Sequence, residues 1–301
     1  MTGLHAKRRY QVLHKTSYTY DLPVTTSYGR GCLRPRASAW QTLLDHSLTV
    51  DPLPQVTDET RDLFGNYTHY LEIHTDHEHL EVTKDSVVDV EWPEVDLSAL
   101  DEYTVAEAAT TLRADSSLDP VEYALYTLPS RHVQLSGVVR EFAEAVVPSR
   151  RPLGEAVEAL YREVYSSFTY TKGATTVSTT LPEVLESRAG VCQDFAHLAV
   201  ACFRAVGLPA RYVSGYIETA PPAGKPKLAG SDATHAWVSV LTPGAGWVDL
   251  DPTNNHLADS RYIVTAWGRD FHDVSPLRGV IFTDATKSSL SVAVGVIPLD
   301  L

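Results

Sequence analysis

The chain has 301 residues, of which 44% are hydrophobic and 21% charged, an ordinary globular composition that suggests two domains or one large one. Its formal net charge of −13 argues against nucleic acid or an anionic membrane surface as the main partner. No stretch approaches the roughly 18 apolar residues of a membrane span, and residues 1–10 lack the apolar core of a signal peptide. The chain has only three cysteines, and an odd number argues against a disulfide scaffold, so we expect a cytoplasmic protein with free thiols.

The N-terminal part of the chain is predicted to be β-rich. Residues 10–14, 47–50 and 79–83 alternate polar and apolar side chains or carry β-branched residues, as half-buried strands do. The sequence Phe64-Gly-Asn-Tyr, between two such runs, is typical of a hairpin turn. We therefore expect a β-rich domain over residues 1–95.

The rest of the chain mixes helices and strands. Residues 96–150 are acidic and weakly patterned, which indicates a linker with a helical segment. Apolar side chains recur at helical spacing over residues 138–145, 153–165, 181–187 and 191–206. Strand patterns follow at residues 210–217, 234–241 and 246–250. We expect a core over residues 151–260 and a C-terminal tail over residues 261–301, with one strand at 289–296, packed on the core or the β-rich domain.

Cys192 is the first candidate for chemistry. It lies just after Gly190, where a turn enters the helix predicted for residues 191–206. Backbone N–H groups in a first helical turn have no intrahelical partner, so they stabilise a thiolate and can donate to an oxyanion. A structural role is the alternative, because Cys192 also extends the apolar stripe of its helix. Cys202 lies in the middle of that stripe and is predicted to be a core residue.

His235 and Asp251 are candidates for the matching base and carboxylate. On the strand predicted at residues 234–241, His235 points to the same side as Trp237. Asp251 ends the following strand on the same side as Asp249. Each residue alone also fits an ordinary structural role. A thiol at a helix start, followed by a histidine and an aspartate in matching settings, fits a nucleophile, a base and an orienting group.

Other polar residues are weaker candidates. His197 and Asp194 share the helix of Cys192 but lie about 140° and 200° around it, so their side chains diverge from the thiol. Asp194 is better explained as a negative charge at the helix N-terminus. The histidines of His74-Thr-Asp-His-Glu-His are expected to be solvated at a hairpin bend, and without a fourth ligand they predict no metal site.

Several segments resemble a known family. Gly190-Val-Cys-Gln-Asp-Phe-Ala-His-Leu, Asp232-Ala-Thr-His-Ala-Trp-Val and Trp247-Val-Asp-Leu-Asp-Pro-Thr-Asn are similar to the core of the bacterial transglutaminase-like superfamily. The segment from Tyr10 to Val90, with Asp62-Leu-Phe-Gly-Asn, resembles the N-terminal region that accompanies this core in bacterial proteins. Trp267-Gly-Arg-Asp looks like part of the same group's tail, so the resemblance covers nearly the whole chain.

The resemblance implies an α+β fold with a papain-like core, in which a helix-borne cysteine packs on an antiparallel sheet, preceded by a sandwich-like β domain. It implies Cys192 as the nucleophile, His235 as the base and Asp251 as the orienting carboxylate. Further candidates for contacts to substrate or to an oxyanion are Tyr170, Gln193, Asp232 and Trp237. Asp232 could orient a loop of the site or only cap a turn.

The function expected from residues and resemblance is thiol-dependent acyl transfer on a carboxamide or peptide bond through a thioester on Cys192. Hydrolysis by an amidase or peptidase is the first expectation, and transamidation the second. The alternative is a catalytically inactive module for binding or scaffolding. The expected substrate is a protein, a peptide or a small amide. No cofactor, metal, nucleic acid or membrane is predicted as a partner, and the sequence leaves the oligomeric state open.

Overall fold

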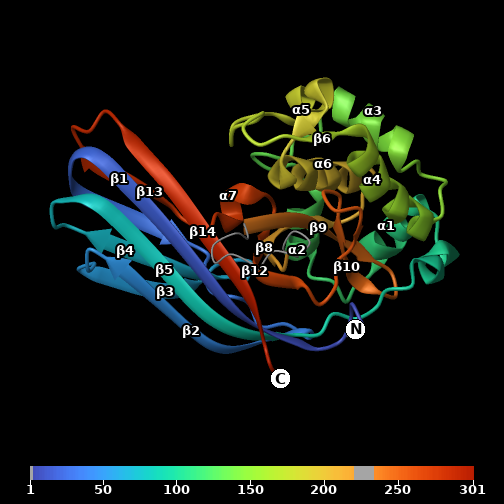
Figure 1. Cartoon of the computed structure of the whole chain (residues 1–301). Coiled ribbons are helices and arrows are strands. Elements are labelled where there is room, and N and C mark those ends of the chain that lie inside the picture. Colours follow the sequence, from blue (N-terminus) through green and yellow to red (C-terminus); the bar gives the residue numbers. More distant parts are fainter. Residues whose placement is uncertain (1–2, 220–233) are drawn as a thin grey trace, which may run out of the picture.

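A computed structural model describes residues 3–219 and 234–301, and it confirms an α+β protein with antiparallel sheets (Figure 1). Within these ranges every helix is too short or too polar to span a bilayer. The larger sheet contains β1 (Arg8–Gly31), β2 (Gln41–Asp51), β3 (Val56–Arg61), β4 (Tyr67–Ile73), β5 (His77–Val90), β13 (Arg278–Thr283) and β14 (Ser288–Leu299).

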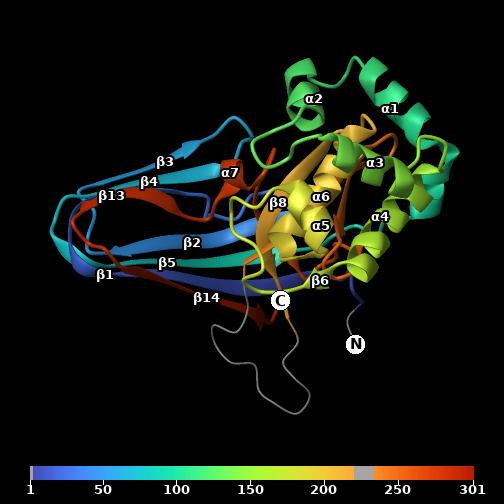
Figure 2. The same cartoon turned by 90° about the horizontal axis from the view of Figure 1, so that it is seen from above.

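The long strand β1 organises the larger sheet. Its first part pairs with β5 and β14, and its last part, residues 24–31, pairs with β4 and β13. On the outer side of β5 and β4 the sheet continues with β2 and β3, respectively. The ladders are interrupted near residues 19–24 of β1, where the register shifts. Figure 2 shows the result: β3, β4 and β13 form one layer, and β2, β5 and β14 form the other.

Apolar side chains fill the space between these two layers near the bend. Burial of this kind of surface stabilises a sandwich by roughly 25 cal/mol per Å². The cluster takes residues from both layers: Tyr20, Val24, Leu33, Val50, Leu71, Ile73, Leu80 and Val82. The expected sandwich-like β domain is therefore present, and its last two strands come from the far C-terminal end of the chain.

The second sheet forms the core and carries the strands predicted from the sequence. Its order is β11 (His256–Leu257), β10 (Gly246–Asp251), β9 (Thr234–Thr242), β8 (Ala210–Ile217) and β12 (Tyr262–Gly268). The helix α6 (Cys192–Ala205) packs on β8 and β9 through its apolar stripe, with Phe195, Leu198 and Phe203 buried. Around it lie α3 (Gly137–Val146), α4 (Leu153–Ser167) and α5 (Leu181–Ser187).

The opposite face of the core sheet packs against the β domain. Residues of β1 and β5, such as Tyr10 and Val88, share a buried cluster with Val213, Trp237 and Tyr262 of the core sheet. The alternation of β9 explains this contact, because Trp237 points to the β domain while Ala236 and Val238 belong to the helix side. The β domain thus covers one side of the core sheet.

The weakly patterned linker is more helical than its pattern indicates. It holds η1 (Leu97–Glu102), α1 (Val105–Ala114) and α2 (Pro120–Thr127). Side-chain caps explain where two of these helices begin. Thr104 and Glu107 form a reciprocal capping box at α1, and Asp119 accepts a hydrogen bond from Val121 N–H at α2. The strands β12 and β13 were also not predicted, although both segments contain β-branched and aromatic side chains.

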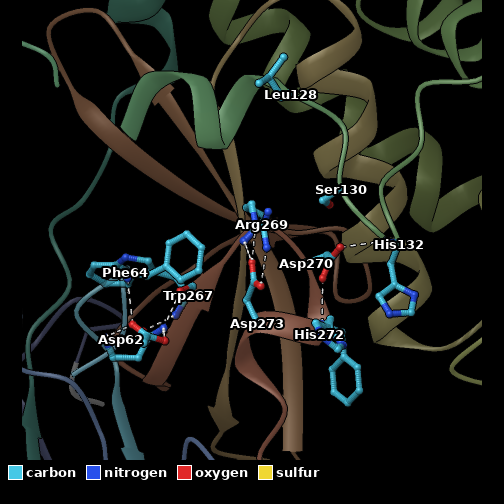
Figure 3. Close-up of polar contacts among 12 residues, drawn as sticks. Asp62, Phe64, Leu128, Ser130, His132, Trp267, Arg269, Asp270, His272 and Asp273 are labelled. Atoms are coloured by element: carbon cyan, nitrogen blue, oxygen red, sulfur yellow. Dashed lines mark hydrogen bonds and ion pairs between the residues drawn. The ribbon is translucent and has the colours of Figure 1, made fainter. Parts of the chain in front are cut away.

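The end of β12 and the residues that follow it join three parts of the chain (Figure 3). The amide of Asn66, in the turn between β3 and β4, accepts from Trp267 N–H at 3.0 Å and donates to Trp267 O at 2.9 Å. Asp270 accepts from the backbone N–H of His132 at 2.9 Å, and Arg269 pairs with Asp273 at the short helix α7 (Phe271–Val274). The irregular sequence Trp267-Gly-Arg-Asp therefore links the β domain and the linker to the core.

Arg204 is expected to contribute strongly to the stability of the contact between the linker and the core. Its buried guanidinium donates to three backbone carbonyls, those of Ala210 (2.8 and 3.0 Å), Leu128 (3.0 Å) and Arg269 (2.8 Å). We expect Arg204→Met to lower the free energy of unfolding by about 3 kcal/mol, because buried carbonyls lose charged donors. Urea unfolding measures the change. Arg162→Met is the control, since Arg162 makes an exposed pair with Glu158, and equal losses in both variants would contradict the assignment.

Candidate active site

Cys192 is the first residue of α6, as its position after a turn predicts. The preceding strand β7 (Ala189–Gly190) pairs with β6 (Thr169–Tyr170) and ends two residues before the helix begins. The carboxylate of Asp194 accepts from Val191 N–H at 2.8 Å and from the Thr175 hydroxyl at 2.7 Å, so it caps the helix. A Cβ on Gly190 would lie 2.8 Å from that carboxylate, which explains the glycine.

His235 lies between the thiol and Asp251. Its Nε2 is 2.6 Å from Asp251 Oδ2, and the imidazole lies near enough to Cys192 for that side chain to contribute to its raised pKa. Because Nε2 contacts the carboxylate, Nδ1 is the ring nitrogen left for the sulfur. The pairing of β9 with β10 places the two side chains on one side of the sheet. Both are buried, His235 at 8% exposure and Asp251 at 0%.

Asp251 accepts hydrogen bonds from several groups besides His235. Asn254 Nδ2 and the Tyr262 hydroxyl each lie 2.6 Å from Oδ2, and the N–H of Thr253 donates to Oδ1 at 2.8 Å. These contacts fix both oxygens of the carboxylate. Sequence reasoning missed Tyr262, although residues 262–267 carry the β-branched and aromatic side chains that are typical of a strand. The pairing of this strand with β8 depends on contacts that are distant in sequence. Asn254 was also missed. It lies three residues after Asp251 in the motif that begins at Trp247, and this short separation is the signal that could have identified it.

The charges of the pair reinforce each other. Burial by itself would lower the pKa of His235, but the charge of Asp251 and hydrogen bonds to Asp251 and Cys192 raise it well above its usual range. Burial would raise the pKa of Asp251, yet the charge of His235 and hydrogen bonds from His235, Tyr262 and Asn254 hold it at about 2. An ionised carboxylate thus favours a protonated imidazole next to the sulfur.

The other residues predicted to contact substrate or an oxyanion lie in different environments. The Tyr170 side chain is 47% exposed, and its ring packs edge-on against Phe195 of α6, with 6.5 Å between the ring centroids. Burial raises the pKa of its phenol. Gln193 is half-buried in the first turn of α6. Trp237 is fully buried and its indole N–H donates to Asp249 at 2.8 Å, so that N–H is not available to an oxyanion. Asp232 lies outside the described residues.

The side chains that the sequence did not assign to the active site have other surroundings. His197 Nε2 accepts from Phe271 N–H at 3.1 Å, and its ring stacks on His132. Cys202 is fully buried in the core. One expectation was wrong: His77 is not solvated but 7% exposed, because Ser27 and the Thr75 carbonyl bind its two ring nitrogens.

Fold and site together define a class of protein: an α+β chain with a helix-borne thiol beside a histidine and an aspartate on an antiparallel sheet. Residues 10–89 match the family described as the bacterial transglutaminase-like N-terminal region, and residues 140–252 match the transglutaminase-like superfamily. The chain belongs to this bacterial transglutaminase-like family, as its motifs predict.

Relatives of similar length occur in mycobacteria. A protein of Mycobacterium tuberculosis is 44% identical over 100% of this chain and 95% of its own length, and one of Mycobacterium leprae is 32% identical over 95% and 97%, respectively. A shorter match, 38% identity over 23% of this chain and 11% of the relative, is to a protein-glutamine gamma-glutamyltransferase of Pseudomonas aeruginosa.

The fold has a counterpart among solved structures. The crystal structure of a protein from Cytophaga hutchinsonii, described as a candidate cysteine protease, aligns with a TM-score of 0.78 at 21% sequence identity. The alignment covers 98% of this chain and 92% of that chain, so the β domain and the core share one architecture in both proteins. Family and fold together support a thiol-dependent enzyme in general terms.

Proposed function

We propose that the protein transfers an acyl group from a carboxamide or peptide bond to Cys192 and then to water. The observation that carries the proposal is the position of His235, which lies 2.6 Å from Asp251 and near enough to Cys192 for that side chain to raise the pKa of the imidazole. A nucleophile, a base and a group that orients the base are the parts that such chemistry requires.

The first half of the proposed reaction forms a thioester. His235 Nδ1 takes the proton of the Cys192 thiol, and the sulfur attacks the carbonyl carbon of the substrate. The C=O electron pair moves to the oxygen, which the N–H groups of the first turn of α6 stabilise. When the pair returns, the C–N bond breaks and the leaving amine takes the proton from His235. Tyr170 is proposed as a second donor to the oxyanion.

The second half releases the acyl group. His235 accepts a proton from water, the oxygen attacks the thioester carbon, and the C–S bond breaks to regenerate Cys192. A primary amine in place of water would give transamidation, and the partial similarity to a protein-glutamine gamma-glutamyltransferase supports testing that acceptor. We propose a protein, a peptide or a small amide as substrate. Because all three cysteines are free, we propose the reducing cytoplasm as the compartment.

A competition between acceptors tests the reaction. The protein is incubated with glutamine-containing peptides and a fluorescent primary amine, and mass spectrometry separates the acid from the amine adduct. We expect ammonia release and more acid than adduct, because water is the proposed acceptor. An excess of adduct would assign a transamidase instead. If neither product forms and an electrophilic glutamine analogue leaves Cys192 unlabelled, the protein is a binding or scaffolding module.

A further inference from the structure

A second group of chemically active side chains lies inside the β domain, away from Cys192. The bend of the larger sheet places β2 in one layer and the β3–β4 pair in the other. His46 of β2, Glu59 of β3 and His69 of β4 meet where the layers separate. Residues 46 and 69 are far apart in sequence and lie on strands that do not pair, so only the bend of the sheet brings them together.

The geometry of this group fits a small divalent ion. One ligand atom from each of the three side chains lies within 4.8 Å of the other two. His69 Nε2 is 3.0 Å from Glu59 Oε2, and the two imidazole rings have centroids 5.5 Å apart. Zinc binds nitrogen and carboxylate oxygen at about 2.0–2.2 Å, so two of its tetrahedral ligands lie roughly 3.4 Å from each other. Small side-chain movements would complete the coordination.

His46 is arranged as a metal ligand usually is. His46 Nδ1 is 2.8 Å from Ser86 Oγ, a second contact of the kind that fixes the ring and leaves the other nitrogen for the ion. His46 Nε2 is buried without a hydrogen-bond partner among the described residues. A buried polar atom of this kind costs about 1–3 kcal/mol unless a partner satisfies it. His69 is itself only 8% exposed.

Two cationic side chains lie beside the three candidate ligands and affect the charge that these ligands offer to a metal ion. Arg34 pairs with Oε1 of Glu59, which leaves Oε2 directed to His69. The ammonium of Lys84 lies over the ring of Tyr216, 4.3 Å from its centroid. Arg34 therefore has a partner of its own, whereas, within the part of the chain that the structure describes, Lys84 Nζ contacts only the ring face and is buried without a hydrogen-bond partner. The set offered to an ion is two imidazoles and one carboxylate oxygen. Nitrogen and oxygen donors in this combination suit zinc.

We propose that His46, Glu59 and His69 bind one zinc ion, with water as the fourth ligand. Glu59 is 30% exposed, so solvent reaches the fourth position. The ion would join β2 to β3 and β4 and hold the two layers together at their open side, where the apolar cluster of the bend no longer reaches. The proposed role is structural, since the group is built on strands of the β domain rather than on the core sheet.

The test must exclude the thiol site, because a cysteine and a histidine also bind zinc. We would therefore measure zinc binding to the full chain carrying Cys192→Ala, first stripped with a chelator. Equilibrium dialysis with elemental analysis gives the stoichiometry, and thermal unfolding with and without zinc gives the stabilisation. We expect one zinc per chain and a higher Tm with the ion.

Two single variants in the same background locate the site. Glu59→Gln keeps the shape of an exposed side chain, and His46→Gln removes the unpartnered nitrogen. We expect each to weaken zinc binding at least about 100-fold and to remove the zinc-dependent rise in Tm. The control is His74→Ala with His79→Ala, which removes two exposed histidines of the same domain and should leave binding unchanged. Absence of zinc binding in the background protein, or binding by Glu59→Gln and His46→Gln as tight as that of the background protein, would overturn the proposal.

Discussion

Cys192→Ala is expected to abolish acyl transfer, with a loss of about 10⁴–10⁶-fold in kcat. The variant removes the atom that forms the proposed thioester, and water cannot use His235 in the same geometry. Initial rates of ammonia release from glutamine peptides measure the loss. Iodoacetamide at neutral pH followed by mass analysis should label Cys192 in the native protein, because His235 is proposed as the base that takes its proton.

Cys202 provides the matched control within the same helix. It is fully buried, and burial raises the pKa of its thiol, so it should resist alkylation in the folded protein. Cys202→Ala should retain activity, at the cost of a small cavity in the core. Slow labelling of both cysteines at the same rate would contradict the assignment of Cys192 as an activated nucleophile.

Asp251→Asn is expected to lower kcat by about 10⁴-fold while the protein stays folded. The amide has the shape of the carboxylate but lacks its charge, so it neither stabilises a protonated His235 nor fixes which ring nitrogen carries the proton. The pKa of His235 should fall, because the favourable charge is removed while burial continues to disfavour the imidazolium. An NMR titration of the imidazole, with and without Asp251→Asn in a Cys192→Ala background, measures this shift.

Tyr262→Phe separates a positioning effect from loss of the charge. It removes one of the hydrogen bonds to Asp251 and leaves the carboxylate and His235 in place. We expect a decrease in kcat of about 10-fold, because the carboxylate is held by Asn254 and Thr253 as well. If Asp251→Asn were as active as the native protein, the carboxylate would have no role in the reaction.

Much of the core was readable from local sequence. The apolar stripe of residues 191–206 and the clean alternation of residues 234–241 predict α6 and β9 nearly to their ends. The same periodicities placed Cys192 at the start of the helix and put His235 and Asp251 on matching sides of their strands. Such patterns are local because a helix or a strand repeats over a few residues.

The contacts between distant segments were not readable. Tyr262 reaches Asp251 only because β12 returns to pair with β8, and Trp237 is committed to Asp249 by the pairing of β9 with β10. His77 is buried because the bent sheet brings it to Ser27. In each case a partner many residues away decides the environment of the side chain.

The family, the α+β class and the residues proposed for the chemistry can be read from the chain alone, because motifs and periodicity lie within short stretches of sequence. The groups that surround these residues follow from long-range packing. The bend of β1 and the return of β13 and β14 to its edge create the sandwich, and with it the meeting of His46, Glu59 and His69. These arrangements depend on long-range strand pairing, whose register no local pattern specifies.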